Sequence, residues 1–254
     1  MNVASQTNGI ELKIEGLYRK INNQVILDHI NFEVHAGETF VIIGPSGSGK
    51  TMLLKHIIGL EKPDGGDVLL NGDSIFKPDT RDRYRLAMVF QSSALLNSLT
   101  VGQNVGLYLT EHNICSPAEI KKIVSEKLEI MGLKGLEDKY PSELSGGMKK
   151  RVAIARALVS DPQLILYDEP TSELDPIMAV NIAREIQKLK HRIKATSLIV
   201  THDRDLAYGI ADRIGIMKNG RMIAIGSKKE IMESNNPEVV EFLNIDFQQL
   251  KIAQ

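Results

Sequence analysis

The residues best suited to chemistry lie in one glycine-rich segment. Residues 44–51 read Gly-Pro-Ser-Gly-Ser-Gly-Lys-Thr, the spacing of a phosphate-binding loop between a strand and a helix. Glycines let backbone N–H groups converge on an anion, and a helix N-terminus adds partial positive charge. The alternative, a turn that binds nothing, is disfavoured because Gly, Lys and Thr all stand at the required positions. The predicted phosphate site comprises Gly44, Pro45, Ser46, Gly47, Ser48, Gly49, Lys50 and Thr51.

Two side chains of this segment have predicted roles beyond the backbone cradle. Lys50 would reach the β- and γ-phosphates of a nucleotide, and the Thr51 hydroxyl would be a ligand of Mg²⁺. A second candidate site pairs with them. The apolar run 164–167 ends in Asp168 and Glu169, so a buried strand would deliver two carboxylates at its carboxyl end. We expect Asp168 to help hold Mg²⁺ and Glu169 to polarise an attacking water.

A third candidate site is a serine-glycine nest formed by Ser145, Gly146 and Gly147. It precedes a helix that we expect to begin near Lys149, and such a turn can bind an anion. A plain serine cap on that helix is the alternative. If the nest does bind phosphate, two copies arranged head to tail would each close one ATP between the phosphate loop of one chain and the nest of the other.

The predicted elements place these sites on an α/β fold. Strands are expected at residues 11–17, 25–34, 39–42, 67–70, 86–90, 164–167 and 196–201, with a hairpin at 213–225. Their alternation with helices predicts a mainly parallel sheet, and the early strands with Asn-Gly turns predict an additional antiparallel layer. We expect a single domain over 1–254, with a core at about 10–91 and 161–233, an inserted helical lobe at 92–160 and a helical tail at 234–254.

Composition excludes several classes of function. The 254 residues carry a formal net charge of −1, which gives no electrostatic case for binding nucleic acid. The single cysteine, Cys115, excludes an intramolecular disulfide and fits a reducing compartment. The first ten residues lack the layout of a signal peptide, and no apolar run reaches the length of a membrane span. Any membrane role is therefore expected to come through a partner.

Taken together, these motifs resemble the ATP-binding subunit of an ABC transporter. The resemblance covers residues 12–233 and includes Leu144-Ser-Gly-Gly, Leu-Tyr-Asp168-Glu and Ser172-Glu-Leu-Asp. It implies a P-loop ATPase that uses ATP and Mg²⁺ and works as a dimer. It implies that Gln91 contacts Mg²⁺ or water and couples the site to the helical lobe, and that Glu169 is the general base. It also implies that Asp175 lies at the dimer interface and that His202 forms a hydrogen bond with the γ-phosphate.

Three positions depart from the pattern of that family. The aromatic residue that commonly stacks on adenine would align near Ile21, and the nearby aromatic is Tyr18, so we expect contact with adenine either to be weaker or to use Tyr18 after a shift of its loop. Met148 replaces the glutamine that usually follows Leu-Ser-Gly-Gly. Glu173 stands where glycine is frequent. None of these changes removes a group needed for phosphate chemistry.

Within the family, the sequence is most similar to the Mla-type ATPases. That resemblance rests on residues 90–95, the segment Leu144-Ser-Gly-Gly-Met148, and residues 167–177. It implies phospholipid transport between bacterial membranes, an MlaE-like permease partner, MCE-domain and small regulatory subunits, and a place at the cytoplasmic face of the inner membrane. Two other classes stay open: a non-transport ABC ATPase, such as one acting in cell division with a membrane partner, and a phosphate-loop kinase or GTPase.

Overall fold

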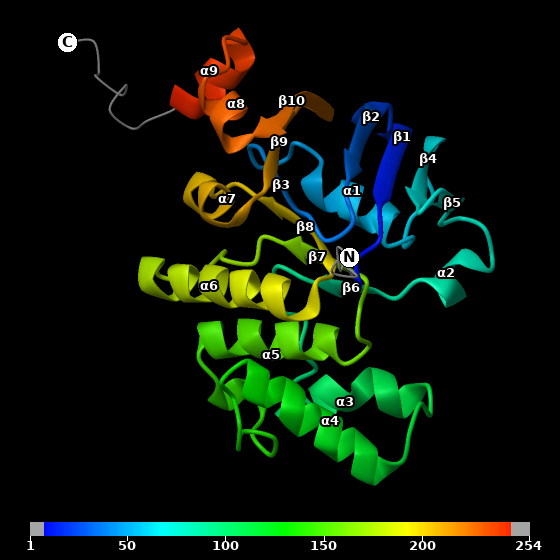
Figure 1. Cartoon of the computed structure of the whole chain (residues 1–254), viewed down its shortest axis with the longest axis vertical. Coiled ribbons are helices and arrows are strands. Elements are labelled where there is room, and N and C mark those ends of the chain that lie inside the picture. The colour runs from blue at the N-terminus through cyan, green and yellow to red at the C-terminus, as the bar shows by residue number, and fades with distance from the viewer. Residues whose placement is uncertain (1–7, 245–254) are drawn as a thin grey trace, which may run out of the picture.

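The computed structural model describes residues 8–244 as two sheets and a group of helices (Figure 1). The larger sheet has the strand order β10-β9-β3-β8-β7-β6, and all its neighbours pair in parallel except the β9–β10 hairpin. Its strands are β3 (Thr39–Ile43), β6 (Leu86–Val89), β7 (Leu164–Asp168), β8 (Thr196–Thr201), β9 (Arg213–Lys218) and β10 (Arg221–Ser227).

The central strands are buried on both faces, which explains their continuous apolar runs. Alternate side chains of β3 enter two different cores. Phe40 and Ile42 pack with α1 (Lys50–Ile57) and the smaller sheet, whereas Val41 and Ile43 pack with the helices on the opposite face. Those helices include α6 (Pro176–Ile193) and α7 (Arg204–Ile210). The larger sheet thus lies between two packed layers, and the loops at its carboxyl edge extend from this fixed framework.

The smaller sheet is antiparallel, with the order β2-β1-β4-β5. Its strands are β1 (Leu12–Ile21), β2 (Gln24–Val34), β4 (Gly65–Leu70) and β5 (Asp73–Ser74), and the short helix α2 (Thr80–Arg83) follows them. Hairpin turns at Asn22-Asn23 and Asn71-Gly72 have both residues at positive φ, as does Asn219-Gly220 between β9 and β10. Such turns match the twist of paired strands, which is why these dipeptides marked the hairpins.

Between β6 and β7 the chain forms a helical lobe, seen in green in Figure 1. It contains α3 (Val101–Glu111), α4 (Pro117–Ile130), the 3₁₀ turn η1 (Pro141–Glu143) and α5 (Gly146–Leu158). Thr100 and Ser116 begin α3 and α4 with capping boxes. The buried Asn104 side chain holds the loop before α3 by accepting from Leu96 N and donating to three carbonyls. The loop that follows Gln91 is therefore tied to the lobe.

The C-terminal helices pack on the edge of the larger sheet. They are α8 (Lys228–Met232) and α9 (Pro237–Asn244). Val239 of α9 is fully buried, and Lys218 of β9 reaches Glu241 at 2.8 Å. The predicted tail therefore packs on its own domain as far as it is described, and its residues 245–254 lie outside the described part.

The fold class predicted from sequence is confirmed, and several predicted boundaries are wrong. The strand expected at 11–17 continues to Ile21 as β1. The strand expected at 67–70 begins earlier, at Gly65, because Tyr18 of β1 pairs with Gly65 and extends the ladder. Helix α5 begins at Gly146 rather than near Lys149, because the Ser145 hydroxyl accepts from Met148 N and caps the helix directly.

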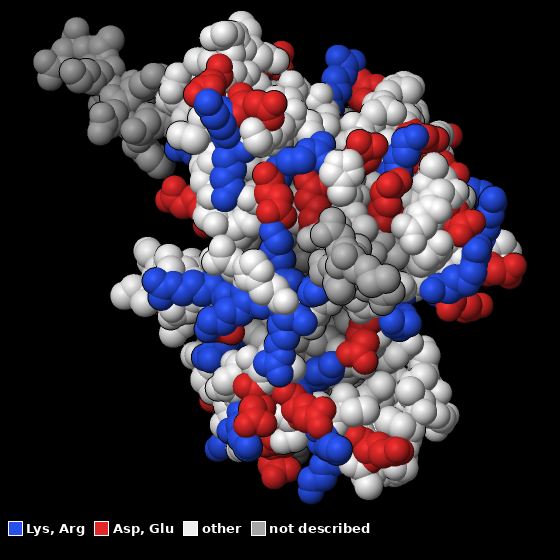
Figure 2. Space-filling view, viewed as in Figure 1, with Lys and Arg blue, Asp and Glu red and all other residues white. Residues whose placement is uncertain are grey.

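Lys and Arg are interspersed with Asp and Glu over most of the face in Figure 2. Within residues 8–244, no helix is long and apolar enough to cross a membrane.

Candidate active site

The phosphate loop connects β3 to α1, and its glycines are required by geometry. Gly47 and Gly49 have φ values of +79° and +103°, which L side chains rarely adopt. A Cβ on Gly49 would lie 2.8 Å from the carbonyl oxygen of Ile26, and one on Gly44 would lie 2.1 Å from that of Met217. The loop is thus wedged between β2 and β9, with its N–H groups at the N-terminus of α1.

Lys50 is buried at the first position of α1. Its ammonium donates to the carbonyl oxygens of Gly44 at 2.8 Å and Pro45 at 3.1 Å, and it lies 3.7 Å from Glu169 Oε1. Burial lowers the pKa of Lys50, and the charges of Glu169 and Asp168 oppose that shift. The cation is thus held inside the loop, where phosphate oxygens would compete with the two carbonyls.

Two oxygen-bearing side chains meet at the second helical position. The Thr51 hydroxyl donates to Asp168 Oδ1 at 3.1 Å. Burial raises the pKa of Asp168, while the Thr51 hydrogen bond and the charge of Lys50 lower it. A hydroxyl and a carboxylate beside a phosphate loop are the hard oxygen ligands that Mg²⁺ prefers. The residues present therefore fit a magnesium ion bound together with a nucleotide.

Glu169 is fixed by its backbone and by three donors. Its φ is +47°, an uncommon value for a residue with a Cβ. Oε2 accepts from Thr201 Oγ1 at 3.0 Å and from His202 N at 3.2 Å, and it lies 2.9 Å from His202 Nδ1. The carboxylate is 8% exposed at residue level, so its orientation is set by β7 and β8 rather than by solvent.

Lys50, Thr51 and Glu169 line one open cavity of about 360 Å³, whereas Asp168 is not among its lining residues. Its walls come from four separate parts of the chain: β2, the phosphate loop with α1, the segment after β6, and the ends of β7 and β8. The lining residues are Ile26, Ser46, Gly47, Gly49, Lys50, Thr51, Met52, Gln91, Glu169 and His202. The parallel sheet thus gathers the predicted phosphate loop, Gln91, Glu169 and His202 at its carboxyl edge.

The family model described as "ABC transporter" matches residues 27–172. The chain belongs to that family. It is 39% identical over 236 residues to the intermembrane phospholipid transport ATP-binding protein MlaF of Haemophilus influenzae, covering 91% of this chain and 89% of that protein. It is 38% identical to a probable ribonucleotide transport ATP-binding protein of Mycobacterium leprae, covering 93% of this chain and 69% of that one. Other relatives are named for sulfate or Fe(3+) import.

A solved ATP-binding cassette, captured as a dimer after hydrolysis with ADP and Pi, superposes with a TM-score of 0.76 at 32% identity. The match covers 85% of this chain and 98% of that one. The chain is therefore the ATP-binding subunit of an ABC transporter, and its enzymatic activity is ATP hydrolysis.

Some predicted site residues of this ABC subunit lie away from the cavity. Tyr18 does not line it; its ring packs on His29, with 5.0 Å between centroids. Asp175 caps α6 by accepting from Ile177 N and Met178 N. Contact of Tyr18 with adenine stays a prediction.

The serine-glycine nest also lies apart from the cavity of its own chain. Ser145 is the cap of α5, and Gly146 and Gly147 form its first turn. A Cβ on Gly147 would lie 2.7 Å from Met178 Sδ, so a larger residue there would have to displace the flexible Met178 side chain of α6.

Two cavity residues were not foreseen from sequence. Ile26 and Met52 provide its apolar wall. Both read as ordinary apolar positions of a strand and a helix, so only the packing of β2 beside the phosphate loop distinguishes them from core residues.

Proposed function

We propose that this subunit powers phospholipid transport between bacterial membranes, as a homodimer bound to a multi-span permease on the cytoplasmic side. The observation that favours this cargo is the length of the match and not the identity, which is 39% for MlaF, 38% for the ribonucleotide relative and 40% for the sulfate relative. The similarity to MlaF runs over nearly the whole of both chains, whereas the ribonucleotide, sulfate and Fe(3+) relatives extend well beyond the matched region. Additional MCE-domain and small regulatory subunits belong to the same proposal.

The proposed dimer is head to tail. Within one chain the nest at residues 145–147 does not line the cavity of the phosphate loop, so neither site of the monomer surrounds a nucleotide completely. A second copy would bring its nest over that cavity, and Asp175 would lie at the dimer interface. Support comes from the related cassette captured as a dimer with ADP and Pi.

Hydrolysis in this proposal uses residues already held in place. Lys50 would exchange the carbonyls of Gly44 and Pro45 for phosphate oxygens, and Thr51, Asp168 and Gln91 would hold Mg²⁺, which neutralises developing phosphate charge when bound. Glu169 would accept the proton of the attacking water. His202, whose side chain is 59% exposed, would donate to the γ-phosphate.

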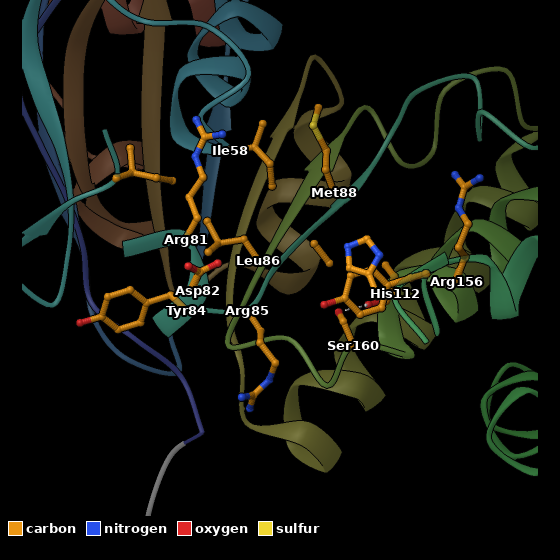
Figure 3. Close-up of a pocket in the computed structure, with 14 residues that line it drawn as sticks. Ile58, Arg81, Asp82, Tyr84, Arg85, Leu86, Met88, His112, Arg156 and Ser160 are labelled. Atoms are coloured by element: carbon orange, nitrogen blue, oxygen red, sulfur yellow. Dashed lines mark hydrogen bonds between the residues drawn. The ribbon is translucent and has the colours of Figure 1, made fainter. Parts of the chain in front are cut away.

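A second cleft offers a place for the permease (Figure 3). Its volume is about 540 Å³, and it lies between the core and the helical lobe. Arg81 and Asp82 line the core side, and His112 and Arg156 line the lobe side. Its lining also includes Leu86, Ala87 and Met88 of β6, the strand that leads to Gln91. A cytoplasmic permease helix in this cleft would therefore contact the strand that positions Gln91.

Co-purification from native membranes tests the proposal. The tagged chain should bring down a multi-span permease, and the complex should contain phospholipid and hydrolyse ATP faster with added phospholipid than with sulfate or ribonucleotide. His112→Asp should weaken permease recovery, because it places a negative charge in the cleft, while the ATPase rate of the isolated chain is retained.

Other outcomes would reject parts of this proposal. Recovery of cell-wall machinery in place of a permease would favour the cell-division class. Recovery of a permease whose complex responds to a small anion but not to phospholipid would retain transport and reject the lipid cargo.

A further inference from the structure

Lys150 is a buried cation that the mechanism above does not use. It lies on α5, five residues after the capping Ser145, and it is 4% exposed. A fully buried lysine is rare unless its charge and its donors are satisfied. Its neighbours therefore identify what it does.

The Lys150 ammonium meets three acceptors, one for each of its protons. It donates to the carbonyl oxygen of Gln91, and it lies 3.4 Å from Ser172 Oγ and 3.5 Å from the carbonyl oxygen of Glu169. That same Glu169 carbonyl accepts from Ser172 N at 3.1 Å and from Ser172 Oγ at 2.8 Å. One side chain of α5 thus contacts the backbones of two cavity residues.

Lys150 contacts the backbone of Glu169, whose conformation must be stabilised by surrounding contacts. Glu169 holds its carboxylate in the cavity from a left-handed backbone conformation, with φ at +47°. Such a conformation persists only where surrounding contacts determine it. Donors from Ser172 and Lys150 fix the carbonyl end of the residue, while Thr201 and His202 fix its carboxylate.

We propose that Lys150 is a positioning residue that locks the backbones of Gln91 and Glu169 to α5. The helix that carries the serine-glycine nest at its N-terminus thereby controls the orientation of the Glu169 carboxylate, the proposed general base of the same chain. Lys150 touches neither substrate nor metal in this role. The inference deepens the proposed function and rests on its composite dimer for one consequence only.

That consequence concerns communication between the two sites of a dimer. The nest of each chain would contact the nucleotide held by its partner, whereas Glu169 acts on the nucleotide of its own chain. Lys150 then forms a side-chain connection from one site to the other, through α5. A rigid element biased by both sites is what coupling requires.

The test compares two substitutions of Lys150 with a control on the same helix turn. Lys150→Met keeps length but removes all donors, and Lys150→Gln keeps a donor without the charge. Lys149→Met removes a neighbouring charge whose side chain makes no hydrogen bond or ion pair among the described residues. Purified full-length chains are assayed for the ATP dissociation constant, kcat, the Hill coefficient and the thermal midpoint.

We expect Lys150→Met to lower kcat about 30-fold, in keeping with the loss that misplacement of a catalytic group causes, while ATP affinity changes less than about twofold. Lys150→Gln should recover part of kcat, and Lys149→Met should match the wild type. The Hill coefficient should fall toward one in Lys150→Met. In a double-mutant cycle, Ser172→Ala should add little to Lys150→Met, because both act on one carbonyl.

A kcat of Lys150→Met within about twofold of wild type, after correction for the folded fraction, would overturn the proposal. Equal losses of ATP binding and kcat would also overturn it, since they would indicate a general packing role. A separate experiment tests the composite dimer: chains that carry Lys50→Ala are mixed with chains that carry Ser145→Arg, and the ATPase activity of the mixture is measured. If that mixture stays inactive while Lys150→Met still lowers kcat alone, the dimer fails and the positioning role stands.

Discussion

Glu169 Oε2 lies 2.9 Å from His202 Nδ1, at the point where β7 and β8 deliver both residues to the cavity of the phosphate loop. The pair places a buried carboxylate beside an exposed imidazole. In the proposed mechanism, the Glu169 carboxylate faces the attacking water and the His202 imidazole reaches toward the nucleotide.

The first prediction follows from the proposed role of that carboxylate. Glu169→Gln should bind ATP with an affinity within about threefold of wild type, because the amide keeps an acceptor for Thr201. Hydrolysis should fall by a factor of about 10²–10⁴, the usual contribution of a general base. Equilibrium binding and single-turnover hydrolysis measure the two quantities. Wild-type turnover in the single-turnover assay would remove Glu169 from the role.

The second prediction tests whether each site draws on two chains. Lys50→Ala should weaken ATP binding about 100-fold, because it removes a buried cation whose charge-assisted bonds are worth about 1.5–3 kcal/mol each. Ser145→Arg should block the nest. Neither homodimer has a sound composite site, but an equal mixture should regain roughly a quarter of wild-type ATPase activity, since half of the dimers gain one site.

Lys55→Ala is the control for that experiment. Lys55 lies on the same helix, is 42% exposed at its side chain and pairs with Glu61 at 3.5 Å, so its loss should change ATP binding little. A mixture no more active than its parents would exclude the trans arrangement.

The third prediction concerns pH and Asp168. Burial raises its pKa above the ordinary value of 3.8, so the folded chain binds a proton more readily than the unfolded chain. Stability from this group is therefore present at low pH and lost as pH rises through the folded-state pKa. Without Mg²⁺, Asp168→Asn should be more stable than wild type at neutral pH, and the difference should shrink as pH approaches 3.8.

Urea denaturation at neutral pH and near pH 3.8 measures the difference in the free energy of unfolding between Asp168→Asn and wild type. Addition of Mg²⁺ with ATP should reverse the order of the two proteins, because only the carboxylate supplies a charged ligand. A difference that does not change with pH would mean that the substitution acts through packing.

The fourth prediction explains a departure from the family pattern. Glu173 has a φ of +64°, a left-handed conformation that suits the glycine frequent at this position. Strain there costs about 1–2 kcal/mol, and glycine loses about 0.5–1 kcal/mol through the unfolded chain. Glu173→Gly should therefore raise the free energy of unfolding by about 0.5–1 kcal/mol.

Glu173→Ala is the matched control, because it removes the same charge but keeps the Cβ. It should give no comparable gain in denaturant titrations. Equal stabilisation by both variants would assign the effect to charge rather than to backbone strain.

Much of this protein follows from local sequence alone. The phosphate loop is readable because glycine spacing and a following Lys-Thr are set by backbone geometry within one turn. The three Asn-containing hairpin turns are readable for the same reason, since positive φ at two adjacent residues restricts the residue types. The apolar run before Asp168 likewise predicts a buried strand without knowledge of its neighbours.

Tertiary structure decided the rest, because the remaining features depend on which segments pack together. Ile26 enters the cavity wall only because β2 lies against Gly49, 23 residues later in the chain. Tyr18 lies against His29 rather than in the cavity because pairing of β1 with β2 sets where its side chain packs. Lys150 reads as one more helix lysine until the fold brings the carbonyls of Gln91 and Glu169 to its ammonium.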